Sequence, residues 1–234
     1  MIFISSLAYG FSASFLSTLI VLAIVVFGII MTLFISKILS KTILKGVPSS
    51  FVLELPPYRK PQIGKVFIRS IFDRTLFVLG RAVSVAIPAG IIIWLFANIY
   101  FNDISILTYV ANFFDPFAKL MGLDGYILTA FILGLPANEI VLPIILMSYM
   151  RTGTLVDLED NFAIGQILLQ NGWTLITAIN VMIFTLLHFP CSTTLMTIKK
   201  ETGKWKWSLI AFALPTVCGI AICMFTNLLW NIFI

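Results

Sequence analysis

The chain of 234 residues is 60% hydrophobic and only 11% charged, with a mean hydropathy of +1.06. Soluble domains carry about 25% charged residues, so this composition excludes an ordinary soluble protein and predicts an all-α polytopic integral membrane protein in a lipid bilayer. The formal charge of +5 is concentrated in two stretches. That pattern is typical of cytoplasmic loops and argues against nucleic acid as a partner.

The first predicted membrane span is Ser14–Ile35, because about 20 apolar residues cross the core of a bilayer. Lys37, Lys41 and Lys45 follow at steps of four, so they share one face of the continuing helix and predict a cytoplasmic anchor. A proline-rich connector comes next, and its double proline forbids a helix there.

After the connector the pattern becomes amphipathic, with an apolar stripe opposite Lys65 and Arg69. It predicts a helix whose basic face lies toward lipid headgroups. This helix leads into a second predicted span, Arg81–Tyr100, kinked near Pro88. Nine of the fifteen Lys and Arg residues lie between positions 37 and 81, which places this segment inside and the N-terminus outside.

The segment Asn102–Gly122 is too polar and too interrupted to span a membrane. Its apolar residues recur at helical spacing, and Asp115-Pro116 predicts a break. We therefore expect a helix or a helix pair lying in the outer membrane interface.

The apolar run Tyr126–Met150 contains Gly134, Pro136 and Pro143, which interrupt a helix, and Glu139 is its only ionisable residue. If every apolar run crossed the membrane once, the later basic cluster would lie outside, against the tendency of Lys and Arg to collect in the cytoplasm. We therefore expect a re-entrant hairpin that enters and leaves on the same face. A simple crossing is the alternative.

The next predicted span is Ile164–Leu187, and the last is Trp207–Trp230, which contains Pro215. Between them lies a second basic cluster made of Lys199, Lys200, Lys204 and Lys206. The predicted architecture is therefore about four spanning helices, one broken or re-entrant helix and amphipathic interfacial helices, with the C-terminus outside.

Glu139 is the first candidate for a functional side chain. A carboxylate at membrane depth costs at least a few kcal/mol, so it requires a partner, an ion or a wet cavity. A broken helix that carries a carboxylate and an amide is how transporters commonly build an ion site, which here points to Asn138 and Glu139. The alternative is a kinked helix in which Glu139 pairs with a structural Lys or lies near the interface.

Cys191 and His188 lie at a second proline-broken helix end. Sulfur and imidazole suit soft or borderline divalent metals and carboxylate or amide oxygens suit harder ones, so a site of Glu139, Asn138 and Cys191 would fit transported Fe²⁺. His188 could add to it, and Asn171 could border the central cavity. The alternative is that Cys191 is a small buried apolar residue and His188 an interface residue.

Three blocks of sequence carry a family resemblance. GVPSSFVLELPPYR at Gly46–Arg59 resembles the connector after a gate region in the ferrous iron transport protein B family. LPANEIV at Leu135–Val141 resembles the broken helix of its second gate region. FPCSTT at Phe189–Thr194 and IKKETGKWKW at Ile198–Trp207 resemble its final block.

The resemblance implies that the chain is the C-terminal half of a transporter for Fe²⁺ uptake across a bacterial inner membrane. It divides the chain into a first transmembrane helix with its anchor (1–45), a cytoplasmic connector with an amphipathic helix (46–80) and a second gate-type region (81–234). Family members begin with a GTPase domain and a first gate region, which these residues do not include.

The chain itself is therefore expected not to be an enzyme and to bind no permanent cofactor. GTP would act only through a partner that carries the GTPase domain and the first gate region, and a homo-oligomer is the other arrangement. A split subunit, a truncated chain and a fragment all fit.

Two other functions stay open at this stage. One is a nucleoside or small-solute carrier of a gate-type fold, which would need aromatic stacking and several amides beside the broken helix. The other is a non-transporting membrane scaffold subunit.

Overall fold

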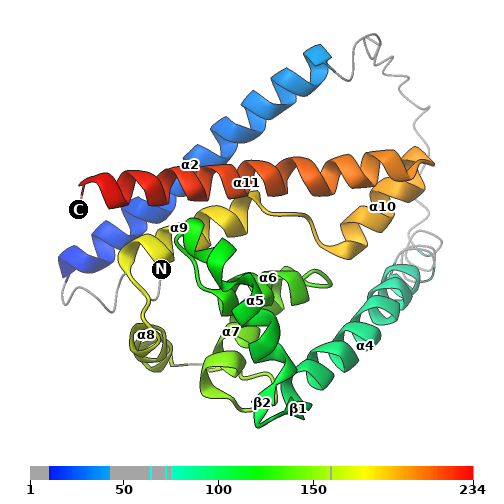
Figure 1. Ribbon diagram of the computed structural model, residues 1–234. Helices are drawn as coiled ribbons and strands as arrows, with labels where there is room; N and C mark the ends of the chain where they lie inside the picture. The colour runs from blue at the N-terminus through cyan, green and yellow to red at the C-terminus, as the bar shows by residue number, and fades with distance from the viewer. Residues whose placement is uncertain (1–10, 43–63, 65–71, 73–74, 159, 234) are drawn as a thin grey trace.

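The computed structural model describes residues 11–42, 64, 72, 75–158 and 160–233. The predicted connector and most of the amphipathic helix that follows it lie outside these residues. Almost all described elements are helices (Figure 1). Three described helices are long and apolar enough to cross a membrane, and a bent pair could form a fourth span. The prediction of an all-α polytopic membrane protein is confirmed.

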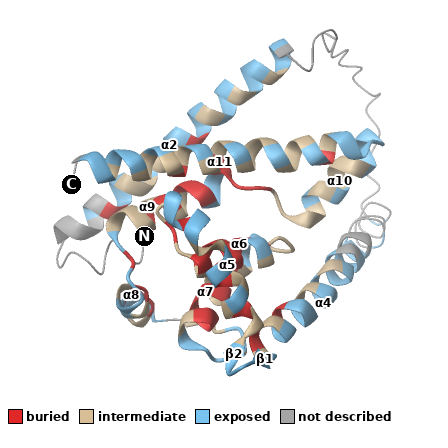
Figure 2. Cartoon of the chain, viewed as in Figure 1, coloured by how far each residue is buried: buried red, intermediate tan, exposed pale blue. Residues whose placement is uncertain are grey.

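Helices α2 (Phe11–Thr42) and α4 (Phe77–Asn98) form two arms of the structure (Figure 1). Helix α2 contains the predicted first span and continues through Lys41. Helix α4 contains Pro88, as the second predicted span requires. Both helices expose large apolar side chains along most of their length, which is the surface a helix presents to lipid (Figure 2).

A short β-hairpin separates α4 from α5 (Ile106–Leu120). Its strands, β1 (Tyr100–Phe101) and β2 (Ile104–Ser105), pair antiparallel. The predicted break at Asp115-Pro116 is wrong, because Pro116 lies inside the single helix α5. The buried face of α5 continues on both sides of the proline, so packing holds the helix together across one lost hydrogen bond.

The predicted broken run folds back on itself. It forms α6 (Gly125–Leu133), the 3₁₀ turn η2 (Asn138–Ile140) and α7 (Val141–Met150). Tyr126 at the start of α6 lies 5.8 Å, ring centroid to ring centroid, from Tyr149 at the end of α7, so the two arms are antiparallel. Arms of 9 and 10 residues rise about 14–15 Å, roughly half of a 30 Å bilayer core.

The two prolines of this hairpin have different roles. Pro136 lies in the unwound stretch between α6 and η2. Pro143 lies in the first turn of α7, where a backbone N–H would have no intrahelical partner. The expectation that Pro143 interrupts a helix is therefore wrong, and the break is made by the residues before η2.

The predicted single span Ile164–Leu187 is also wrong. Two helices, α8 (Asn161–Gln170) and α9 (Leu175–Leu187), take its place. Gly172 has a φ of +82°, and the N–H groups of Gly172 and Trp173 donate to Leu169 O and Leu168 O. This pattern is a Schellman motif, which ends α8. The hydroxyl of Thr174 then caps α9 by accepting from Thr177 N–H at 3.3 Å.

Helices α9 and α10 (Ser192–Thr202) run one after the other beside α11 (Trp205–Phe233), as Figure 1 shows. Early α9 contacts late α11, because Thr226 Oγ1 donates to Asn180 Oδ1 at 2.6 Å. At the other end, Ser208 Oγ near the start of α11 donates to Leu195 O of α10 at 2.9 Å. The broken helix α9–α10 is therefore antiparallel to the unbroken α11, which contains the last predicted span.

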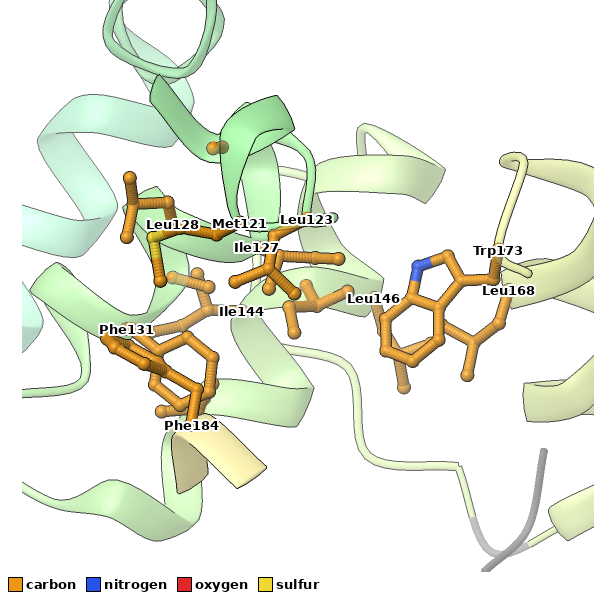
Figure 3. Packing of buried hydrophobic residues seen from close by; sticks show 14 of the residues in the cluster. Met121, Leu123, Ile127, Leu128, Phe131, Ile144, Leu146, Leu168, Trp173 and Phe184 are labelled. Atoms are coloured by element: carbon orange, nitrogen blue, oxygen red, sulfur yellow. The ribbon is translucent and has the colours of Figure 1, made fainter. Parts of the chain in front are cut away.

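The buried core lies where the hairpin meets α5, α8 and α9 (Figure 2). Phe131 of α6 and Phe184 of α9 pack edge to face with ring centroids 4.8 Å apart (Figure 3). Leu146 of α7 lies between this cluster and the Leu168–Trp173 side of the core, as the same view shows. The core therefore fixes the hairpin against the base of α9.

Candidate functional site at two helix breaks

The breaks of the two interrupted segments meet. The N–H of Ser192, the first residue of α10, donates to the carbonyl oxygen of Leu135, which follows α6, at 2.9 Å. Discontinuous helices that meet within the membrane are the arrangement in which transporters place ion and substrate sites. This junction is therefore the candidate functional site.

A tight turn forms the hairpin side of the junction. Leu135 N–H donates to Ile132 O at 3.3 Å, and Ala137 N–H donates to Gly134 O at 3.0 Å. Gly134 is buried, and a Cβ at that position would lie only 2.5 Å from Val141 Cγ2. The absence of a side chain at Gly134 therefore allows α6 and α7 to approach each other at the turn.

Asn138 and Glu139 follow this turn on η2, and both are exposed. Glu139 has no ion-pair or hydrogen-bond partner among the described residues. The alternative, in which Glu139 pairs with a structural Lys, is therefore not supported by any described residue. An exposed carboxylate about halfway along a membrane hairpin is costly unless it meets water, an ion or another polypeptide segment.

Cys191 lies at the N-cap of α10 and is half-buried. Its Sγ lies 3.1 Å from Thr193 Oγ1 and 3.2 Å from Thr194 Oγ1, and both hydroxyls can donate to sulfur. The N-terminus of a helix carries partial positive charge. The surroundings of Cys191 can thus stabilise negative charge on the sulfur. A cysteine that served only as a small buried apolar residue would not need such surroundings.

His188 ends α9 and is only 7% exposed. Its Nδ1 lies 2.9 Å from Thr185 O, and since a carbonyl only accepts, Nδ1 carries a proton, which in the neutral ring leaves a lone pair on Nε2. That Nε2 and the nearby Ser192 Oγ are buried without a hydrogen-bond partner among the described residues. Phe131 lies 5.2 Å from the His188 ring, centroid to centroid.

Other candidate residues are placed differently. Asn171 is exposed at the end of α8, where its amide donates to Ile167 O at 2.8 Å within its own helix. Asn180 of α9 is fully buried and donates to Met121 O at 2.8 Å. No group of three or more His, Cys, Asp or Glu side chains in the described part of the chain is placed to hold a metal ion.

Two family models match the chain. The model described as ferrous iron transport protein B C terminus matches residues 21–73, and the gate model, described as nucleoside recognition, matches residues 79–205. The second match covers more than half of the chain and includes both helix breaks. The chain therefore belongs to the gate family, and the two models together, in this order, match it to the C-terminal part of the ferrous iron transport protein B family.

Relatives in this family match only through their C-terminal part. The chain is 30% identical over 225 residues to the Fe(2+) transporter FeoB of Staphylococcus aureus (strain COL), covering 93% of this chain and 32% of the relative. It is 25% identical over 227 residues to the Fe(2+) transporter FeoB of Methanocaldococcus jannaschii, covering 91% and 32%. The chain thus spans about a third of these relatives. No solved structure matches it.

Sequence reasoning missed the contact at the centre of the site. The Ser192–Leu135 bond joins two backbone groups, so no side-chain pattern specifies it. The available signal was the two prolines near the bonded residues: Pro136 directly follows Leu135, and Pro190 lies two residues before Ser192. Each proline interrupts a helix and frees backbone groups that must find partners elsewhere.

Proposed function

We propose that this chain forms the membrane part of a ferrous iron transporter in which Fe²⁺ passes the junction of the two helix breaks. The observation that supports the proposal is the Ser192–Leu135 hydrogen bond, which joins the turn that precedes Asn138 and Glu139 to the residue that follows Cys191. The family membership and the names of the relatives supply the ion.

The side chains at the junction suit a transported cation. Glu139 supplies a negative charge that offsets the lost hydration of the ion, and Asn138 supplies a carbonyl oxygen. Cys191 adds sulfur, and the Nε2 lone pair of His188 adds nitrogen from a buried position. A conducted ion must also leave, so a site with few ligands suits transport better than a closed cage.

The site is completed by another polypeptide segment in this proposal. Glu139 is exposed on the surface of the described chain, and the matched relatives are about three times as long. We infer that the remaining part of the transporter, with its first gate region and GTPase domain, covers the turn, and that a second copy of this chain is the alternative. GTP hydrolysis would belong to that part, and the assembly would lie in the inner membrane.

The test is Fe²⁺ flux into liposomes that contain this chain together with the remaining part of the transporter. Glu139→Gln should lower the flux about tenfold or more, because it removes a charge while keeping the shape. Cys191→Ser should change the preference among Fe²⁺, Mn²⁺ and Zn²⁺, because sulfur ligation biases that order. The double variant should be non-additive if both residues meet one ion.

The chain offers matched controls. Glu201→Gln removes a carboxylate from the exposed end of α10, and Cys218→Ser changes a half-buried thiol of α11. Neither control should alter flux or metal preference. Unchanged flux and preference in Glu139→Gln and Cys191→Ser, at equal protein levels, would refute this ion path.

A nucleoside carrier is the second candidate, because the gate model is described as nucleoside recognition. Nucleoside bases are bound by stacking on aromatic faces. At the α9–α10 break, Phe189 is buried and already stacks on Phe212, with ring centroids 4.9 Å apart. The iron reading is therefore preferred. Uptake of labelled nucleoside by the same liposomes, with Fe²⁺ flux absent, would reverse this preference.

A further inference from the structure

A second site lies away from the helix breaks, where the end of α4 meets the β-hairpin, the start of α5 and the end of α7. It is a pocket of about 240 Å³ with both polar and apolar walls. Four polar or charged residues that contribute to it are Asp103, Ser105, Thr108 and Arg151. A pocket of this kind binds a molecule with a charged end and an apolar end.

The walls of this pocket are fixed by the fold. Asn98 Nδ2 donates to Gly153 O at 2.7 Å and ties the end of α4 to the loop after α7. Asn102 and Asp103 have φ values of 51° and 62°, which form the two-residue turn that joins β1 to β2. Arg151 follows α7 with a φ of 52°, a conformation that non-glycine residues adopt infrequently.

The two charged residues of the pocket have no partners among the described residues. Lys119, in the last turn of α5, forms an ion pair with Asp115 at 2.5 Å. Arg151 and Asp103 form no ion pair with a described residue, although both line one pocket. One site therefore presents an unpaired cation and an unpaired anion, which suits a ligand that carries both charges.

Two hydroxyl groups, of Ser105 and Thr108, line the same pocket. Ser105 Oγ and Thr108 Oγ1 are 2.9 Å apart, and one donates to the other. Since each hydroxyl has one hydrogen, the accepting hydroxyl keeps its own hydrogen for a further acceptor. Phosphate oxygens are strong acceptors of such hydrogens and of arginine N–H groups.

The surface beside the pocket is apolar and aromatic. Trp94 and Tyr100 are 56% and 57% exposed, and Phe101 on the β-hairpin is 68% exposed. Ile91 and Ile92, one turn or less before Trp94, are also exposed on α4. Exposed aromatic rings at the end of an apolar helix mark the headgroup level of a membrane.

We propose that this pocket binds the zwitterionic phosphoethanolamine headgroup of a phospholipid. The phosphate lies on Arg151 and the Ser105–Thr108 hydroxyl pair, the ammonium lies on Asp103, and the acyl chains follow the exposed apolar side of α4. A soluble phosphoethanolamine ester shares the headgroup chemistry, but it would make no use of that apolar surface.

Native mass spectrometry of the full chain, extracted in mild detergent with defined lipids, tests the proposal. The chain should retain phosphatidylethanolamine in preference to phosphatidylglycerol. Arg151→Gln should lower retention of both lipids about tenfold, because it removes a charge-assisted contact, and Arg151→Lys should restore most of it. Asp103→Asn, which keeps a residue suited to the turn, should abolish the preference between the two lipids.

The control is Lys119→Gln, which removes one positive charge from the last turn of α5, outside the pocket lining, and should leave retention unchanged. Equal losses in Lys119→Gln and Arg151→Gln would overturn the proposal, as would an unchanged lipid preference in Asp103→Asn. Displacement of the lipid by glycerophosphoethanolamine at equal concentration would assign the pocket to a soluble ligand instead, and would also overturn it.

Discussion

The N–H of Ser192 donates to the carbonyl oxygen of Leu135 across 2.9 Å, and this bond joins the helical hairpin to the broken helix α9–α10. The bond uses two groups that each break leaves without a partner in its own helix. Because both are backbone groups within the apolar depth of the structure, losing the bond would leave the Leu135 carbonyl unsatisfied there. The contact therefore fixes the turn after α6 against the start of α10.

Substitution of Ser192 by proline should break this contact selectively. Ser192 is the first residue of α10, where proline fits a helix, and Cys191 has φ −58° and ψ 156°, which the residue before a proline prefers. Ser192→Pro should lower stability by about 1–2 kcal/mol, measured by unfolding in detergent. Ser192→Ala keeps the N–H and should have little effect. Equal effects of the two variants would contradict this role of the bond.

Tyr149→Phe should loosen the base of the hairpin. The Tyr149 hydroxyl donates to the Asp124 carboxylate and accepts from Trp173 Nε1 at 2.9 Å, so it links α6, α7 and the loop before α9. Its removal should cost about 1–3 kcal/mol, because the partly buried Asp124 oxygen loses its donor. Thermal unfolding followed by tryptophan fluorescence measures the loss. Tyr109→Phe, whose exposed hydroxyl bonds Phe101 O at 3.3 Å, is the control and should change stability little.

Asn180→Ala should destabilise the contact between α9, α11 and the end of α5. The buried amide donates to Met121 O at 2.8 Å and accepts from Thr226 Oγ1 at 2.6 Å. Polar contacts between membrane helices are worth about 1–2 kcal/mol, so the free energy of unfolding of the variant, measured in detergent, should be lower by that amount. Asn171→Ala removes only an exposed bond within α8. A loss of stability in Asn171→Ala as large as that in Asn180→Ala would contradict the role given to the buried amide.

The membrane topology can be tested by cysteine labelling, after the three native cysteines are replaced by alanine. Lys204→Cys should react with a membrane-impermeant maleimide only from the cytoplasmic side, and Asp157→Cys only from the outside. The reason is that the hairpin starts and ends on one face, whereas α9–α10 crosses to the second basic cluster. Labelling of Asp157→Cys from the cytoplasm would restore the simple crossing of residues 126–150.

Hydropathy and proline positions were enough to predict most of the helices. Twenty or more apolar residues define α2 and α11 whatever they contact, because the bilayer fixes the required length. The break before Glu139 was predictable as well, because Gly134 and Pro136 interrupt any helix locally. Such features depend on nearby residues and on the solvent, so the sequence contains them directly.

Features that depend on capping or on distant contacts were not predicted. Asn171-Gly172 ends α8 inside an apolar run, because Gly172 has a positive φ. Hydropathy averaged over a window of residues does not reveal a helix end made by a single glycine. Pro116 was expected to break a helix that burial holds together on both sides. The junction of Ser192 with Leu135 involves only backbone atoms, so it could be seen only after the chain had folded.

The antiparallel arms of the hairpin have a mechanical consequence. Both ends of α6–α7 lie on the same side, marked by the Tyr126–Tyr149 contact, so no loop of the hairpin emerges on the other side. A shift of its tip along the membrane normal would therefore carry no charged loop through lipid. The ionisable side chain that moves with the tip is Glu139, and neutralising it by a bound cation would lower the cost of that shift.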